Sequence, residues 1–307
     1  MILIKNCYNE RRIGGFDMKG IILAGGSGTR LYPITEGISK QLMPIYDKPM
    51  IFYPLSTLMM AGIQDILVIT TEQDQEGFIR LLGDGSKFGV NLNYVVQPSP
   101  DGLAQAFILG ADFIGQEPCA MVLGDNLYFG NDFEKLLLAA KENAYQNDAT
   151  NFGYAVKDPE RFGIMELDKD KNIISVEEKP THPKSKYAIT GLYFYPDDVV
   201  SKSKLVKKSP RGELEITTLN DMYLQEGRLK AQLLGDGFTW FDTGTPDSQL
   251  EAANMIKTIQ SNKGRVICAP EIIGYQNGWL SKEELLQRGE LLHKNDYGKC
   301  LIKVAKE

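Results

Sequence analysis

From Met18 onward, short apolar runs alternate with stretches of helical length and period, and this alternation constrains the fold more than any other feature of the sequence. Candidate strands lie at 20–24, 66–70, 92–96, 120–123 and 151–156, and candidate helices at 49–61, 73–82 and 102–114. Strands that alternate with helices form right-handed βαβ units, because only that connection packs the helix back onto the sheet. The sequence therefore predicts an α/β fold with a mostly parallel sheet that helices cover on both faces.

The second half of the chain has a different texture. Shorter strand-like pieces lie at 173–176, 188–195 and 229–234, and a polar segment at 201–215 interrupts them. A helix is predicted over 246–260, with Thr245 as its N-cap and proline at its first position. Residues 261–307 are expected to form a small helical appendage, in which Ser281 and Glu284 make a capping-box pattern.

The net charge and composition limit the kinds of ligand and cell surface that the protein can bind. The net charge of -6 gives no attraction to nucleic acid or to an anionic membrane, so phosphate must be held by a local cluster of Lys and Arg. No apolar stretch approaches the roughly 18 residues of a membrane span, so we expect a soluble, cytoplasmic protein. Four scattered cysteines and two histidines do not favour a zinc site or a disulfide framework. Residues 1–17 lack the apolar core of a secretory signal; they are interpreted as an extension, with a translation start at Met18 and a short functional tail as the alternatives.

A glycine-rich turn, LAGGSGTRL at 23–31, directly follows the first buried strand. Gly25, Gly26 and Gly28 allow the backbone to approach a ligand with its N–H groups, and Arg30 adds a fixed positive fork. A P-loop would need Gly-Lys-Ser/Thr, and a dinucleotide fingerprint would need a third glycine where this chain has leucine. The turn indicates phosphate binding, with a plain tight turn between strand and helix as the alternative.

Two loops that follow add polar side chains. Lys40, in the segment SKQLMP, is placed to neutralise a phosphate, although a lone lysine is more often simply solvated. Gln97 and Gly102 lie in QPSPDG after a predicted strand, at the end where open α/β sheets bind ligands. Gln97 is a candidate for contact with a base edge; without other support this segment is an ordinary turn.

Two aspartates are candidates for a metal site. Asp125 ends the apolar run MVLGD, and Asp242 lies in the turn WFDTGT just before a predicted helix. Mg²⁺ takes one or two carboxylates and completes its shell with phosphate oxygens and water. The alternative is that Asp125 caps the segment after it. In the second half, Glu178 and Lys179 end a strand in EEKP and could hold sugar hydroxyls and a sugar phosphate, although an exposed charged turn would look the same.

The blocks GGSGTRL, SKQLMP, QPSPDGLAQA, VLGDN, EEKP, ITGLYFY, PRGELEIT and FDTGT occur in this order. Together they resemble the sugar nucleotidylyltransferase family, and QPSPDGLAQA with PRGELEIT is typical of its thymidylyl branch. The resemblance runs from about Met18 to nearly the end of the chain, and residues 1–17 have no counterpart in it. It implies a Rossmann-like, mixed but mostly parallel sheet, with a nucleotidyltransferase core at 18–260 and the appendage at 261–307. Within the core, a nucleotide-binding half would span about 18–156 and a sugar-binding half about 157–245.

The resemblance also implies the reaction and the residue roles. Deoxythymidine triphosphate (dTTP) and α-D-glucose 1-phosphate would give dTDP-glucose and pyrophosphate with Mg²⁺, through in-line attack on the α-phosphorus. The triphosphate would be held by Gly25, Gly26, Gly28, Thr29 and Arg30, and the rest of the nucleotide by Gln41, Gln97 and Gly102. The sugar side would be lined by Asn126, Gly163, Glu178, Lys179 and Ile189. Arg30, Lys40 and Lys179 would act in catalysis, and Asp125 and Asp242 would hold the metal.

Further implications are a homotetramer, feedback inhibition by dTDP-rhamnose, and a product that feeds dTDP-rhamnose or another deoxysugar of a surface polysaccharide. Two alternatives remain open from the sequence. One is a UDP- or CDP-sugar pyrophosphorylase of the same fold, since a single methyl group of thymine discriminates by only about 1–3 kcal/mol. The other is a non-catalytic sugar-nucleotide sensor, because a fold does not fix a function.

Overall fold

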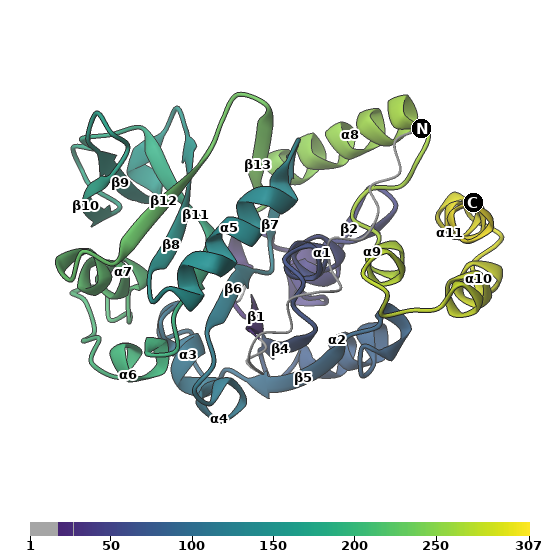
Figure 1. Ribbon diagram of the computed structural model, residues 1–307, viewed down its shortest axis with the longest axis horizontal. Coiled ribbons are helices and arrows are strands. Elements are labelled where there is room, and N and C mark those ends of the chain that lie inside the picture. Colours follow the sequence, from purple (N-terminus) through teal and green to yellow (C-terminus); the bar gives the residue numbers. More distant parts are fainter. Residues whose placement is uncertain (1–17, 27) are drawn as a thin grey trace.

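The computed structural model describes residues 18–26 and 28–307, so the expectation for residues 1–17 lies outside the described residues. Within this part of the chain, nine strands form one mixed sheet in the order β10-β9-β11-β6-β1-β4-β5, with β8 joined to β11 and β12 to β8 (Figure 1). These strands are β1 (Lys19–Ala24), β4 (Asp65–Thr70), β5 (Asn91–Val96), β6 (Cys119–Leu123), β8 (Ala149–Ala155), β9 (Gly163–Leu167), β10 (Ile173–Glu178), β11 (Tyr187–Tyr195) and β12 (Leu229–Leu234). Strands β6, β1, β4 and β5 run parallel, whereas β11 runs antiparallel to β6, β8 and β9. The predicted α/β fold is confirmed.

Strands β1, β4 and β6 are buried on both faces. Along β1, Ile21 and Leu23 pack into one hydrophobic cluster, while Ile22 and Ala24 pack into another on the opposite face. This alternation is what the period of two along a strand requires when helices cover both sides. The covering helices before β8 are α1 (Phe52–Met60), α2 (Gln75–Leu82), α3 (Gln105–Leu109), α4 (Ala111–Ile114) and α5 (Phe133–Tyr145).

Several predicted boundaries need correction. The helix expected over 102–114 is broken at Gly110 into α3 and α4, and a β-carbon at that position would come within 3.1 Å of the Ala106 carbonyl oxygen. Helix α1 begins only at Phe52, because the short strands β2 (Pro44–Ile45) and β3 (Lys48–Pro49) occupy the segment before it. The polar segment over 201–215 overlaps the end of α6 (Val199–Ser203) and leads into α7 (Ile216–Gln225), which the sequence analysis missed.

A two-stranded ribbon lies beside the main sheet and was also missed. Strand β7 (Asn126–Gly130) pairs antiparallel with β13 (Phe238–Asp242), so that Asp242 lies opposite Asn126. The helix predicted after it is confirmed as α8 (Pro246–Lys263), with the Thr245 side chain accepting a hydrogen bond from the Ser248 N–H. The ribbon carries the second half of the chain back to the carboxyl end of β6.

The C-terminal helices form the predicted appendage, α9 (Pro270–Gln276), α10 (Lys282–Leu291) and α11 (Asp296–Lys306), at one end of the molecule (Figure 1). The capping box of Ser281 and Glu284 begins α10 as expected. The fully buried Glu271 of α9 accepts hydrogen bonds from Arg288 of α10, at 3.2 Å, and from Tyr297 of α11, which ties the three helices together. None of the helices in the described ranges has the length and apolar character that crossing a membrane requires.

Candidate active site

A cavity of about 540 Å³ opens where the parallel strands end, and both halves of the chain line it. The residues predicted for the site that line it are Arg30, Asp125, Asn126, Gly163, Glu178, Lys179, Ile189 and Asp242. The structure thus brings together side chains that the sequence separates by most of its length. We call this space the catalytic cavity.

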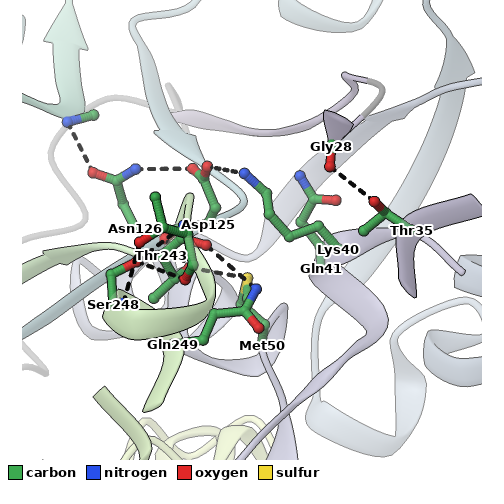
Figure 2. Close-up of polar contacts among 12 residues, drawn as sticks. Gly28, Thr35, Lys40, Gln41, Met50, Asp125, Asn126, Thr243, Ser248 and Gln249 are labelled. Atoms are coloured by element: carbon green, nitrogen blue, oxygen red, sulfur yellow. Dashed lines mark hydrogen bonds and ion pairs between the residues drawn. The ribbon is translucent and has the colours of Figure 1, made fainter. Parts of the chain in front are cut away.

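The ribbon of β7 and β13 brings the two aspartates to the same cavity. Asp125 follows the end of β6, and Asp242 ends β13. Thr243, which is fully buried, donates two hydrogen bonds to the backbone oxygen of Asp125, from its N–H at 3.2 Å and from its hydroxyl at 2.7 Å (Figure 2). These bonds fix the end of the ribbon against the end of β6, and so place both carboxylates on one wall.

The two carboxylates have opposite electrostatic surroundings. Burial alone would raise the pKa of Asp125, but the Lys40 ammonium, which donates a hydrogen bond to it, holds that pKa below its usual value (Figure 2). Burial, reinforced by the charge of Asp125, raises the pKa of Asp242. The charges of Lys40, Arg30 and Arg161 lower the pKa of Asp242 in turn but do not cancel this rise, so a cation bound beside the two carboxylates would favour the ionised form of Asp242.

The glycine turn leads directly into the segment that carries Arg30. Gly28 has a left-handed backbone, with φ of 59°, and its carbonyl oxygen accepts a hydrogen bond from the Thr35 hydroxyl at 2.8 Å. Thr29 and Arg30 follow in a short 3₁₀ turn. A β-carbon at Gly244 would lie only 2.5 Å from a guanidinium nitrogen of Arg30, so the glycine of FDTGT makes room for the arginine.

A second cavity of about 440 Å³ lies on the other side of the glycine turn, and Gly26 and Gln97 line it with Glu72, Pro98 and Pro100 among others. The amide oxygen of Gln97 lies over Gly25, in the space that a side chain there would occupy. We call this space the nucleotide cavity. Gln97, the residue that the sequence predicts to contact the base, lines this cavity.

Gln41 and Gly102 line neither of these two cavities. Gln41 is buried, accepts a hydrogen bond from the Ser39 hydroxyl at 2.8 Å, and packs against Gly124. Gly102 has a positive φ of 109°, and the backbone of Leu214 occupies the place of its missing side chain. Both residues pack against the chain in this structure, and their contact with a nucleotide stays a prediction.

Hydrogen bonds hold Asn126 and Glu178 in the wall of the catalytic cavity. Asn126 is buried; its amide oxygen accepts from Trp240 Nε1 at 2.6 Å and from the Gly191 N–H at 3.2 Å, and its NH₂ donates to Asp125 at 2.9 Å. Glu178 accepts a hydrogen bond from the Thr217 hydroxyl at 2.5 Å.

Further lining residues were not selected from the sequence. They are Arg161, Gly191, Tyr193, Thr217 and Trp240. Thr217 ends the block PRGELEIT, and Trp240 precedes the block FDTGT, so their places beside two blocks of the resemblance were the available signals. Tyr193 lies inside the block ITGLYFY, whereas Arg161 lies in none of the blocks and had no such signal.

Comparisons with known proteins identify the family of this chain. The family model for nucleotidyl transferases matches residues 19–259, so the chain belongs to the nucleotidyl transferase family, a family of enzymes. A glucose-1-phosphate thymidylyltransferase from Neisseria gonorrhoeae is 56% identical over 285 residues, which cover 93% of this chain and 98% of the relative. One from Mycobacterium tuberculosis is 50% identical over 287 residues, covering 94% and 99%. Within the family, the chain groups with the glucose-1-phosphate thymidylyltransferases.

Solved structures agree with the fold. A Bacillus anthracis protein assigned as a glucose-1-phosphate thymidylyltransferase, solved with sucrose, has a TM-score of 0.71 and 40% identity and covers 78% of this chain and 94% of its own. A UDP-glucose pyrophosphorylase complexed with UDP-glucose has a TM-score of 0.70 at 24% identity and covers 80% of this chain. The second likeness shows the fold alone.

Proposed function

We propose that this protein transfers the deoxythymidylyl group of dTTP to α-D-glucose 1-phosphate, giving dTDP-glucose and pyrophosphate. One observation carries the proposal: a single cavity gathers Arg30, Lys179, Asp125 and Asp242 beside the glycine turn. Phosphoryl-type transfer needs little covalent chemistry from a protein, so it depends on positioned cations and on the orientation of two reactants. The names of the relatives support these two substrates.

The charges suggest how the reactants are arranged. The glycine turn and Arg30 hold the triphosphate, and Arg30 offsets charge at the reacting phosphorus and on the departing pyrophosphate. Lys179, on the far wall of the catalytic cavity, binds the phosphate of glucose 1-phosphate, whose oxygen attacks in line. Lys40 is paired with Asp125 in this structure, and because its ammonium has three N–H donors it can bind a phosphate oxygen while it keeps that ion pair.

The carboxylates fit a divalent cation, which we propose is Mg²⁺. In the part of the chain that the structure describes, no group of three or more His, Cys, Asp or Glu side chains is arranged to hold a metal. Asp125 and Asp242 form a pair on one wall, which suits a cation that takes two carboxylates and fills its shell with phosphate oxygens and water. When bound, it would offset phosphate charge that otherwise repels the attacking oxygen.

The test is pyrophosphate release by the purified protein with glucose 1-phosphate and Mg²⁺, comparing dTTP, UTP, CTP, ATP and GTP with and without EDTA. We expect the fastest release with dTTP and none with EDTA. A preference for UTP or CTP would support the alternative pyrophosphorylases and overturn the choice of base. No release with any triphosphate, from folded protein, would favour the non-catalytic sensor.

A third cavity supports a regulatory role. It has a volume of about 530 Å³ and is lined by the far end of β7, the end of α8 and helix α11, with Lys263, Arg265 and Lys303 among its residues. Lys263 lies 5.1 Å from the ring centre of Phe129. Three cations in the lining, one of them over an aromatic ring, suit a nucleoside diphosphate, so we propose that dTDP-rhamnose acts here as a feedback inhibitor of a cytoplasmic homotetramer. If Arg265→Ala leaves inhibition by dTDP-rhamnose unchanged, this site is wrong.

A further inference from the structure

Gln97, which lines the nucleotide cavity, forms a hydrogen-bonded relay with two residues behind it, Gln105 and Asp101. Gln97 Nε2 donates to Gln105 Oε1 at 2.7 Å, and Gln105 Nε2 donates to the Asp101 carboxylate at 3.3 Å. The backbone N–H of Asp101 also donates to Gln105 Oε1 at 3.3 Å. All three residues come from the loop after β5 and the first position of α3.

The relay determines which way the Gln97 amide faces. A backbone N–H only donates, and an ionised carboxylate only accepts, so Asp101 fixes both ends of the Gln105 amide. Lys208 forms an ion pair with the Asp101 carboxylate at 3.3 Å. Because Gln105 presents its oxygen to Gln97, Gln97 must present its NH₂ to Gln105. The Gln97 oxygen consequently faces the opposite way, over Gly25, and accepts no hydrogen bond from the described residues.

An amide oxygen with this orientation selects among pyrimidines. Thymine and uracil carry N–H at ring position N3, which an oxygen accepts, whereas cytosine has a bare acceptor nitrogen there. For cytosine to bind equally well, the Gln97 amide must rotate, which breaks its bond to Gln105 and puts two oxygens against each other. A site with a fixed polar group rejects a mismatched ligand because the groups are left unpaired.

We propose that Gln105 is a positioning residue that makes the enzyme discriminate against cytosine, by holding the amide oxygen of Gln97 toward the base. The inference rests on the proposed function, since it takes Gln97 as the base contact. It adds a residue that touches no substrate and acts through Gln97 alone. It also separates the choice between thymine and cytosine, which the relay controls, from the choice between thymine and uracil, which it does not.

The test compares kcat/KM for dTTP, dCTP and dUTP in Gln105→Met and Gln105→Glu. Methionine removes the fixed acceptor, so the ratio of dTTP to dCTP should fall by about tenfold or more, mainly through KM, while the ratio of dTTP to dUTP stays constant. Glutamate still accepts from Gln97, so it should keep the first ratio within about threefold of wild type. The matched control is Gln64→Met, which removes a bond to the Gly89 carbonyl oxygen at the other end of β4 and should change neither ratio.

Equal dTTP to dCTP ratios in wild type and Gln105→Met would overturn the inference, and so would an equal loss in the methionine and glutamate variants. If Gln105→Met does not fold, Gln105→Ala carries the same expectation. Failure of the proposed function looks different, because the wild-type protein would then turn over none of the three nucleotides or would prefer dCTP or dUTP to dTTP.

Discussion

Asp125 and Asp242 lie on one wall, but their charges are compensated unequally. Asp125 has the Lys40 ammonium as a partner, whereas the pKa of Asp242 is raised by burial and by the nearby charge of Asp125. In the metal-free protein above that pKa, the charge on Asp242 therefore works against folding. Lys40, Arg30 and Arg161 offset the charge of Asp242 only in part, so its ionised form carries a cost in stability that a bound cation would reduce.

This difference predicts opposite effects of two matched substitutions on stability. In metal-free protein at pH 8, Asp242→Asn should increase the free energy of unfolding, because it removes a repelled charge. Asp125→Asn should decrease it by roughly 1 to 3 kcal/mol, because it leaves the Lys40 ammonium without its partner. Urea denaturation with EDTA measures both, and both variants should lose turnover. A loss of stability in both would show that Asp242 is compensated in the free protein.

Lys179 is the proposed contact to the sugar phosphate, and its place on the catalytic cavity makes a kinetic prediction. Lys179→Gln should raise KM for glucose 1-phosphate by about tenfold or more, with KM for dTTP little changed, because only one substrate loses a charged contact. Lys184→Gln, at an exposed position in the same loop, is the control. An equal rise in both KM values would contradict the assignment of Lys179 to the sugar phosphate.

At the scale of elements, helix α8 fixes the turn that follows Asp242. Its N-cap Thr245 bonds the Ser248 N–H at 3.2 Å, and the Ser248 hydroxyl accepts in return from the Thr245 N–H at 3.1 Å. Thr245→Ala should therefore lower the free energy of unfolding by about 1 kcal/mol. Ser281→Ala removes the equivalent cap of α10, far from the cavity, and should cost a similar amount without changing kcat. Urea titrations give both costs; a negligible cost for Thr245→Ala would mean that packing alone holds the turn.

The elements that the sequence predicted well are those with a local signal. Strand β1 could be predicted because its residues are apolar on both faces. Helices α8 and α10 could be predicted because the residues of each cap lie close together in the sequence. The ribbon of β7 and β13 was missed because its two strands are distant in sequence and neither shows a clean alternation. Helix α7 was missed because polar residues before it obscured its start at Ile216.

The same limit applies to the candidate site. Motifs indicated Asp125 and Asp242 separately, but their meeting depends on the ribbon and on Thr243, which no local pattern reveals. For Gln41 and Gly102, the motifs predict a nucleotide contact, and the structure adds that both residues pack against the chain and line neither cavity. The residue types were enough to predict which side chains suit phosphate or a metal ion. They were not enough to predict which of these side chains line the same cavity.

At the scale of the whole molecule, the third cavity and the proposed assembly belong together, because feedback requires two distinct sites on one protein. Light scattering with size exclusion should give four times the chain mass of 34.3 kDa. A mass of one or two chains at micromolar concentration would contradict the homotetramer and leave the catalytic proposal intact.

The most direct test of the central claim is a ³¹P NMR spectrum of one reaction containing the protein, dTTP, glucose 1-phosphate and Mg²⁺. The account predicts the coupled pair of signals of a sugar nucleoside diphosphate, together with pyrophosphate in equal amount, and neither with Asp125→Ala. Pyrophosphate or inorganic phosphate without the sugar nucleotide would show hydrolysis instead of transfer. Products that persist unchanged in Asp125→Ala would show that the catalytic cavity described here is not where the reaction occurs.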